Sequence, residues 1–257
     1  MYERVAVGED QDFGRAFGAY LDRRMLRILL LGAMSGFPWV LIGSALTLWL
    51  KEDGLSRSAV GWAGLIFSIY AVNFLWAPLI DRISIPRLGA RIGQRKAWII
   101  LFQAIILVGL AGWSLLRPAD NIWLVMLIGL GIAAASASQD ITIDALRIEQ
   151  IDAGEKTAMA AGAAVHVVGW WSGYKIGGII ALLAADMFQA AGHSNYWQMS
   201  FILLGCLIVL SNIGLLLIPE VSAAARLKAQ QAAGERIAAR FSTVGAFSRF
   251  TGFIGST

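Results

Sequence analysis

The chain has 257 residues, of which 58% are hydrophobic and 15% are charged, and its formal net charge at pH 7 is +4. A soluble domain usually carries about 25% charged residues, so this composition argues against a soluble globular protein. The basic residues are spread over several loops rather than gathered on one segment, which argues against nucleic-acid binding.

Apolar residues gather into six blocks that are each long enough to cross a membrane. A hydrocarbon core of about 30 Å needs about 20 helical residues, because a helix rises about 1.5 Å per residue. Strands of a membrane barrel would instead alternate in polarity over about ten residues. The sequence therefore predicts an all-α integral membrane protein with six transmembrane helices, over residues 25–50, 58–80, 97–116, 122–143, 158–185 and 198–218.

The residues before and after these blocks are more polar. The first 24 residues contain many charges and no apolar core, so we expect no cleavable signal peptide. The sequence thus divides into a cytoplasmic N-terminal segment over 1–24, a six-helix bundle over 25–218 and a cytoplasmic linker over 219–257. The linker pattern fits an amphipathic helix on the inner leaflet, and a solvated linker helix equally well. Apolar residues after Phe247 resemble the start of a truncated seventh span.

The orientation follows from the distribution of arginine and lysine. Seventeen of them lie in the N-terminal segment through Arg27, after the last block, or in the 81–96 and 144–157 connections, whereas the other connections hold three. Because cytoplasmic loops carry an excess of basic residues, we expect both termini to be cytoplasmic. Lys175 is the remaining one and lies inside the fifth block.

Polar residues mark the cytoplasmic end of the fourth span. Asp140 and Asp144 are four residues apart and therefore share one helix face, and Arg147 lies close enough to pair with Asp144. For Asp144 and Arg147 we favour ordinary ion pairing at the membrane interface. Gln139 and Asp140 lie deeper, where a polar group is costly, so we expect them to line a cavity.

The connection between the second and third spans contains Asp81 and Arg82, followed by Gly93-Gln94-Arg95-Lys96. An acid at a helix end and a basic loop with glycine resemble the hallmark loop of the major facilitator superfamily. A longer insert, residues 83–92, departs from that loop and indicates a subfamily. The alternative is a basic loop that only obeys the positive-inside rule.

The fifth span combines glycines with titratable groups. Gly169, Gly173 and Gly177 recur every four residues, a stripe that lets a neighbouring helix approach closely. Lys175 lies too deep to reach either surface easily, so we expect it to face a cavity. Antiparallel pairing of the fourth and fifth spans makes His166, rather than Lys175, the expected partner of Asp140.

Four segments together carry a family resemblance. They resemble the AmpG-type muropeptide permeases, proton-driven members of the major facilitator superfamily. The segments are Ser35-Gly36-Phe37-Pro38, Phe74–Arg82, Ser136-Ala137-Ser138-Gln139-Asp140 with Asp144, and Gly173-Tyr174-Lys175-Ile176-Gly177. The family often has arginine where Lys175 stands, so the charge is kept but the bidentate geometry is lost.

The resemblance implies the N-terminal half of a major facilitator fold, since family members place the substrate between two six-helix halves. It also implies proton-coupled import of anhydromuropeptides from cell-wall turnover across a bacterial inner membrane. The implied partners are the lipid bilayer, an amino-sugar peptide, protons and a second six-helix half. Two alternatives stay open: a fragment of an acetyl-CoA-type or other major facilitator transporter, and a truncated membrane protein that transports nothing.

The expected site residues fall into three groups. We expect Gly36, at a kink of the first span, Gln139 and Lys175 to contact substrate, and Asp140 and His166 to couple protons. A cytoplasmic gate would comprise Asp81, Arg82, Asp144 and Arg147. The sequence contains neither a metal-ligand cluster nor a paired nucleophile and base, so we expect no enzyme activity, no metal and no cofactor.

Overall fold

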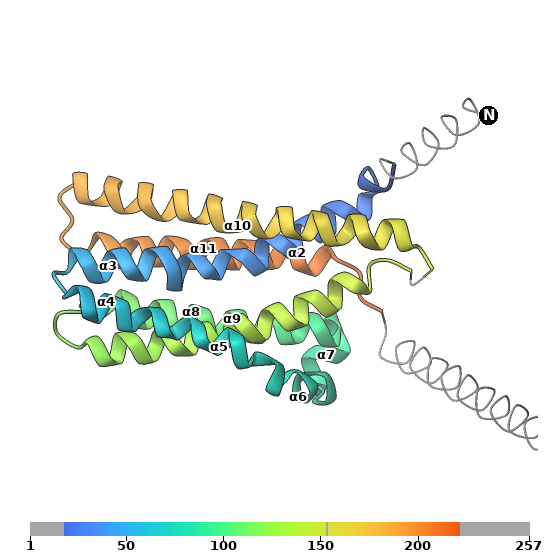
Figure 1. The fold of residues 1–257 in the computed structure, drawn as a ribbon, viewed down its shortest axis with the longest axis horizontal. Coiled ribbons are helices and arrows are strands. Elements are labelled where there is room, and N and C mark those ends of the chain that lie inside the picture. The colour runs from blue at the N-terminus through green and yellow to red at the C-terminus, as the bar shows by residue number, and fades with distance from the viewer. Residues whose placement is uncertain (1–17, 153, 222–257) are drawn as a thin grey trace, which may run out of the picture. The chain divides into compact units, whose positions relative to one another are not determined.

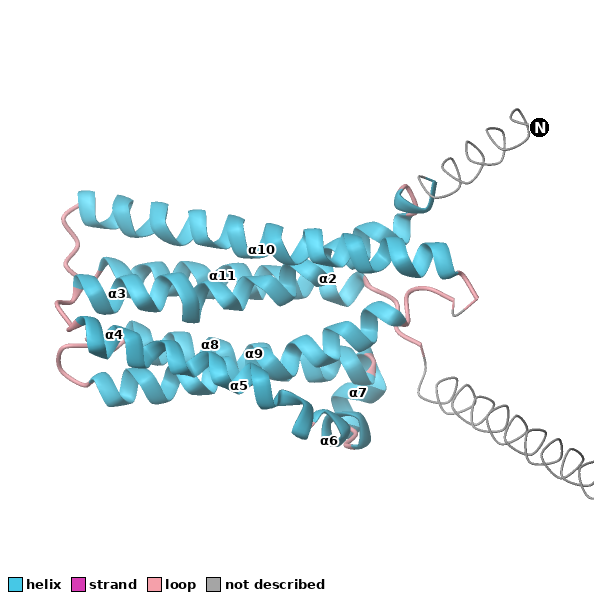
Figure 2. Cartoon of the chain, viewed as in Figure 1, coloured by secondary structure: helices cyan, strands magenta, loops and turns pink. Residues whose placement is uncertain are grey.

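The computed structural model describes residues 18–152 and 154–221, which form helices joined by short connections without a β-strand (Figure 2). The prediction of an all-α chain is confirmed. Most of the expected segment 1–24, together with the expected amphipathic helix and truncated seventh span of the linker, lies outside the described residues.

Six helices in the described part are long and apolar enough to cross a membrane, as predicted. They make the chain a multi-pass membrane protein and are consistent with one half of a bundle of the major facilitator type. The six spans are Arg23–Glu52, Arg57–Leu75, Gln94–Trp113, Ile122–Ile148, Lys156–Ala190 and Tyr196–Leu217.

The first two spans are each built from several helical elements. The first comprises α2 (Arg23–Val40), the π-helix η1 (Leu41–Ala45) and α3 (Leu46–Glu52). The second comprises α4 (Arg57–Ala63), the 3-10 helix η2 (Gly64–Phe67), α5 (Ser68–Val72) and the 3-10 helix η3 (Asn73–Leu75). The later helices are α6 (Ala77–Arg82), α7 (Pro86–Ile92), α8 (Gln94–Ser114), α9 (Ile122–Ile148), α10 (Lys156–Ala190) and α11 (Tyr196–Leu217).

One expectation about these spans is wrong, and the kink expected at Gly36 stays a prediction. The irregular turn of the first span is η1, which begins three residues after Pro38. A proline removes the hydrogen bond to the carbonyl four residues before it, here that of Met34, so Gly36 lies within the turn that Pro38 disturbs. The second span ends at Leu75 rather than at the expected residue 80, and α6 starts after Trp76. Pro78 lies in the first turn of α6, where its missing amide hydrogen costs nothing.

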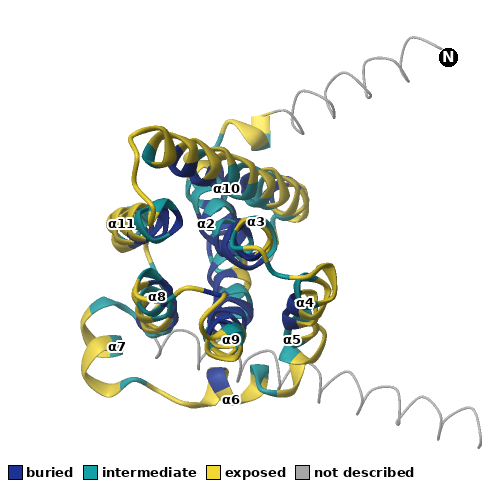
Figure 3. Ribbon diagram, turned by 90° about the vertical axis from the view of Figure 1, so that its left-hand side faces the viewer, coloured by how far each residue is buried: buried dark blue, intermediate teal, exposed yellow. Residues whose placement is uncertain are grey.

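The first span lies in the middle of the bundle. Figure 3 views the end that carries the α3–α4, α8–α9 and α10–α11 connections, and there α3 is surrounded by α4, α8, α9, α10 and α11. In Figure 1, α10 runs beside α2, and α9 runs beside α8. Near this end of the bundle the rings of Trp49, Trp113 and Phe201 pack together, with the Trp49 and Phe201 centroids 4.9 Å apart. The other buried side chains of this core are mostly aliphatic.

Glycines bring α2 and α10 into backbone contact. A Cβ atom on Gly173 would overlap the carbonyl oxygen of Ala33, and one on Gly169 would overlap that of Leu29. The relation is mutual, because a Cβ atom on Gly36 would overlap the carbonyl oxygen of Trp170. The predicted packing role of the glycine stripe is therefore confirmed. We call Gly32, Gly36, Gly169, Gly173 and Gly177 the glycine seam.

An ion pair joins the same two helices at one end of the seam. The guanidinium of Arg24 donates to both carboxylate oxygens of Glu155 at 2.8 Å, and Asp22 accepts from the backbone and side chain of Arg24. Hydrogen bonds from Arg24 hold the pKa of both carboxyl groups below their usual values. Because these carboxylates are partly open to water, the pair orients the helix ends more than it stabilises them.

The glycine seam predicts unequal effects of two alanine substitutions in α10. Gly173→Ala should lower the free energy of unfolding by about 1–3 kcal/mol, because the added methyl group overpacks the contact with α2. Gly178→Ala is the matched control, since a methyl group added there would meet no atom within 4 Å. It should be neutral, or stabilising by up to about 1 kcal/mol through helix propensity. Thermal unfolding in detergent measures both, and equal effects would contradict the seam.

Candidate functional site

The carboxylate of Asp140 on α9 lies against the first span. Ser35 Oγ on α2 donates a hydrogen bond of 2.7 Å to Asp140 Oδ1. The indole N–H of Trp39 is buried next to this carboxylate, close enough to interact with it, and has no other hydrogen-bond partner among the described residues. No basic side chain in the described ranges forms an ion pair with Asp140. The group is therefore an acid held by a neutral donor inside a membrane span.

Aromatic rings from three spans gather around Trp39, whose indole lies beside this acid. The Trp39 ring lies 5.0 Å from Phe67, 4.6 Å from Tyr70 and 5.3 Å from Trp170, measured between centroids. Trp170 in turn stacks on Tyr174 at 5.7 Å. All five side chains are half-buried, so each keeps part of its surface open. We call these five residues the aromatic wall.

Small hydroxyl side chains fix the wall to its neighbours. Tyr70 donates to Ser136 Oγ on α9 at 2.7 Å, and the Tyr174 and Ser44 hydroxyls lie 3.2 Å apart. Trp76 Nε1 donates to Ser138 Oγ at 2.9 Å. The serines around Asp140 thus hold the second span against α9. Hydrogen bonds that cross between spans restrict which way these rings can turn.

Two of the expected substrate contacts lie inside the bundle instead. Gln139 is fully buried, and its Nε2 donates to the Met34 carbonyl oxygen at 3.0 Å. Gly36 is buried in the glycine seam against Trp170. Both residues were expected on an open surface that contacts substrate. The structure buries both of them, because α2 packs directly on α9 and α10. Gln139 Oε1 is buried without a hydrogen-bond partner among the described residues.

Lys175 lies at the edge of the aromatic wall. Its side chain is exposed on α10, and its ammonium group is 5.7 Å from the Trp171 ring centroid and 5.9 Å from that of Tyr174. Both distances fit cation–π contacts. The expected absence of a bridge between Lys175 and Asp140 agrees with the ion pairs of the described residues.

The expected pairing of His166 with Asp140 is wrong. His166 Nε2 lies 3.6 Å from Asp144 Oδ1, and Arg147 Nε lies 3.2 Å from the same oxygen. The observed partner, Asp144, lies one helical turn along α9 from the expected partner, Asp140. The expectation matched heights by assuming an equal rise along two parallel helices, and this assumption fails by about one turn when the helices cross at an angle. In the described part of the chain, no group of three or more His, Cys, Asp or Glu side chains could hold a metal ion.

The four expected gate residues do not form one cluster: Asp81 belongs to one, Asp144 and Arg147 to another, and Arg82 to neither. Asp81 pairs with Arg95 at 3.3 Å, and Arg95 also pairs with Glu149 at 2.6 Å, whereas Asp144 and Arg147 form the other cluster with His166. Arg82 is exposed and forms no ion pair with the described residues. Glu149 was not expected as a partner from the sequence, since only packing brings the end of α9 against the start of α8.

The start of α8 is also fixed by the residues that follow α11. Glu220 accepts hydrogen bonds from the backbone N–H groups of Arg95 and Lys96, at 2.8 and 3.0 Å. Lys96 Nζ donates to the carbonyl oxygen of Ile218 at 3.0 Å. A carboxylate at a helix N-terminus satisfies free N–H groups and complements the helix dipole. The connection between the second and third spans is therefore held to the end of α9 and to the residues that follow α11.

These contacts predict that Arg95 matters more than Arg82 for stability. Arg95→Gln removes two ion pairs with partly buried geometry and should lower the free energy of unfolding by about 1–3 kcal/mol. Arg82→Gln, in the same connection, should change it by less than about 0.5 kcal/mol. Denaturation in detergent measures both variants. Similar losses for the two would mean that the Arg95 contacts carry no stabilisation.

Known proteins resemble this chain over most of its length. The chain is 30% identical over 201 residues to the transporter AmpG 4 of Rickettsia felis, covering 78% of this chain and 46% of that protein. It is 33% identical over 181 residues to the anhydromuropeptide permease of Escherichia coli, covering 70% of this chain and 35% of the permease. No family model matches the chain, and no solved structure matches it significantly.

The chain spans less than half the length of these relatives. The matched region is nevertheless most of this chain, and the two relatives are named a transporter and a permease. The expected resemblance is therefore confirmed: the chain is a homologue of the AmpG-type transporters, matching part of their length.

Proposed function

We propose that the chain forms the N-terminal half of a secondary transporter that imports anhydromuropeptides together with protons. The observation that carries the proposal is Asp140, an acid without a basic partner among the described residues of the membrane spans. The names of the relatives supply the substrate class, since one of them is called an anhydromuropeptide permease. A second six-helix half would complete the path.

Asp140 is the proton-coupling group in this proposal. An unpaired carboxylate costs at least about 2.5 kcal/mol near the middle of a bilayer, so such a residue needs a functional reason. Ser35 donates one hydrogen bond to it, which leaves the other oxygen able to take up a proton. His166 has Asp144 as its partner and would act at the cytoplasmic end instead.

The aromatic wall is the proposed surface for the amino sugar. Aromatic rings offer wide apolar faces while their N–H and O–H groups supply hydrogen bonds, a combination that suits a sugar ring. Lys175, at the edge of the wall beside Tyr174, would attract the carboxylate of the peptide part. Gln139 and Gly36 would support the wall through the packing of α2 rather than touch the substrate.

The proposed orientation places the end of the bundle with Asp22 and Glu220 in the cytoplasm and the protein in a bacterial inner membrane. The excess of basic residues in these segments supports it. The Arg95 cluster (Asp81, Arg95 and Glu149) and the Asp144 cluster (Asp144, Arg147 and His166) would then lie on the cytoplasmic side. Their ion pairs would break and re-form as access to the substrate site alternates between the two sides of the membrane.

Uptake into proteoliposomes containing the complete transporter tests the role of Asp140. Asp140→Asn keeps the hydrogen bond from Ser35 but cannot lose or gain a proton, so proton-driven accumulation of anhydromuropeptide should be lost while exchange of bound substrate persists. Asp186→Asn, an exposed acid on α10, is the control and should accumulate substrate normally. Normal accumulation by Asp140→Asn would exclude Asp140 from coupling.

A further inference from the structure

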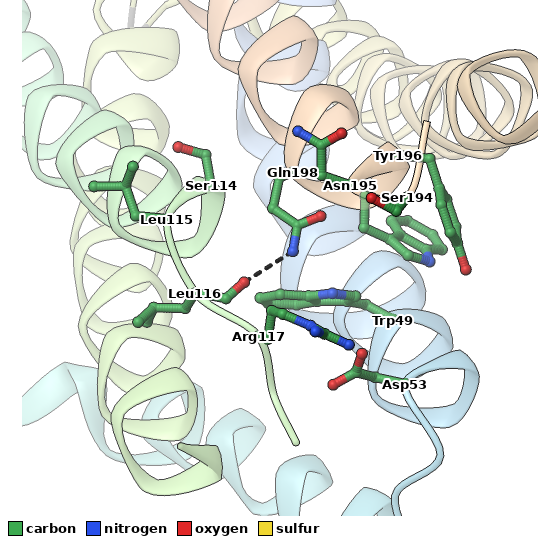
Figure 4. Close-up of a pocket in the computed structure, with 11 residues that line it drawn as sticks. Trp49, Asp53, Ser114, Leu115, Leu116, Arg117, Ser194, Asn195, Tyr196 and Gln198 are labelled. Carbon is green, nitrogen blue, oxygen red and sulfur yellow. Dashed lines mark hydrogen bonds between the residues drawn. The ribbon is translucent and has the colours of Figure 1, made fainter. Parts of the chain in front are cut away.

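A polar cavity lies at the other end of the bundle from the two ion-pair clusters. Its volume is about 300 Å³, and it opens where three connections meet (Figure 4). We call it the Trp49 pocket. It is lined by Trp49, Asp53, Ser114, Leu115, Leu116, Arg117, Ser194, Asn195, Tyr196, Trp197 and Gln198.

Hydrogen bonds between the connections hold the pocket in shape. Asp53 Oδ2 accepts from the Ala119 backbone N–H at 2.6 Å, and Gln198 Nε2 donates to the Leu116 carbonyl oxygen at 2.8 Å. Trp197 Nε1 donates to Glu52 Oε2 at 2.7 Å. The three links join α3, the α8–α9 connection and the start of α11. A pocket whose walls are fixed in advance loses little entropy when a ligand binds.

The floor of the pocket is rigid. Trp49 is 2% exposed and packs edge-on against Trp113 and Phe201, with centroids 5.9 and 4.9 Å away. The ring therefore serves as a base rather than as a mobile cover. Above it, Gln198 points into the space between the connections (Figure 4).

Opposite charges meet in this pocket. Arg117 is exposed, and its guanidinium forms no ion pair with the described residues, while Asp53 uses one carboxylate oxygen for Ala119. Both side chains lie beside the Trp49 ring in Figure 4. A purely anionic ligand would be repelled by Asp53, and a purely cationic one would be repelled by Arg117. The pocket therefore favours a ligand that carries both charges.

The position of the pocket indicates where such a ligand comes from. Trp62 and Trp123, at the same end of the bundle, are 67% and 82% exposed, as expected for an aromatic belt at headgroup depth. Leu115, on the pocket wall, is 85% exposed. Further exposed apolar residues continue along the same helix at helical spacing, which provides a track for an acyl chain: Val108, Ile105 and Leu101.

We propose that the Trp49 pocket binds the headgroup of a zwitterionic phospholipid, whose phosphate contacts Arg117 and whose ammonium group contacts Asp53. Arginine can offer two parallel N–H groups to phosphate oxygens. The acyl chains of this lipid follow the exposed face of α8. The site is separate from the Asp140 region and does not depend on the proposed transport function.

Native mass spectrometry of the purified chain in detergent tests this site. The bound fraction is measured while phosphatidylethanolamine or phosphatidylglycerol with the same acyl chains is titrated. The wild-type chain should prefer phosphatidylethanolamine. Arg117→Gln should weaken binding of both lipids about tenfold, the effect of losing roughly one charged hydrogen bond. Asp53→Asn keeps an acceptor for Ala119 and should remove the preference by weakening phosphatidylethanolamine alone.

Arg57→Gln is the matched control, because Arg57 lies at the same end of the bundle but outside the pocket. It should bind both lipids as the wild-type chain does. Equal losses for Arg57→Gln and Arg117→Gln, or no lipid preference in the wild-type chain, would overturn the site. Soluble glycerophosphoethanolamine should compete only weakly. Competition as strong as that of the lipid would assign the pocket to a soluble zwitterion and overturn the lipid assignment.

Discussion

Direct backbone contact between α2 and α10 is the constraint on which the rest of the bundle depends. Along most of the glycine seam, at Gly32, Gly36, Gly169 and Gly173, the backbone of one helix lies directly against the glycines of the other. This approach brings Trp170 to the ring of Trp39. The same helix, α2, carries Ser35 to the carboxylate of Asp140. Without the seam, the aromatic wall and the acid would not share one surface.

The general architecture could be predicted from the sequence, because it depends on local features. Length and hydrophobicity identify six spans, and a glycine every fourth residue identifies the close-packed face of the fifth. The Asp144–Arg147 ion pair within α9 could also be predicted, because its members are three residues apart on one helix, whereas partner choice between helices could not be predicted. His166 pairs with Asp144 and Asp81 with Arg95, and such pairs depend on how neighbouring helices cross and rotate. The aromatic wall escaped prediction for a similar reason, since its rings come from three separate spans.

The described bundle keeps different polar chemistries apart along its length. Ion pairs join α8 to α6 and α9 near one end, and the Trp49 pocket lies at the other. Between them, Asp140 on α9 accepts a hydrogen bond from Ser35 on α2 and lies beside Trp39 of the aromatic wall. Polar groups at membrane depth are tolerated where protein or water satisfies them. The proposed transport path therefore requires that the aromatic wall face water and substrate rather than lipid.

Thiol accessibility tests this requirement most directly. Cys206 is exposed and is the single cysteine of this chain, so Cys206→Ser, together with serine at any cysteine of the second half, provides a background without thiols. Two variants then carry Tyr174→Cys in the aromatic wall or Val209→Cys on the exposed apolar face of α11. In the membrane-embedded complete transporter, a water-soluble thiol reagent should modify Tyr174→Cys quickly and leave Val209→Cys unmodified. Equal protection of both cysteines would contradict the proposed path, because the wall would then face lipid.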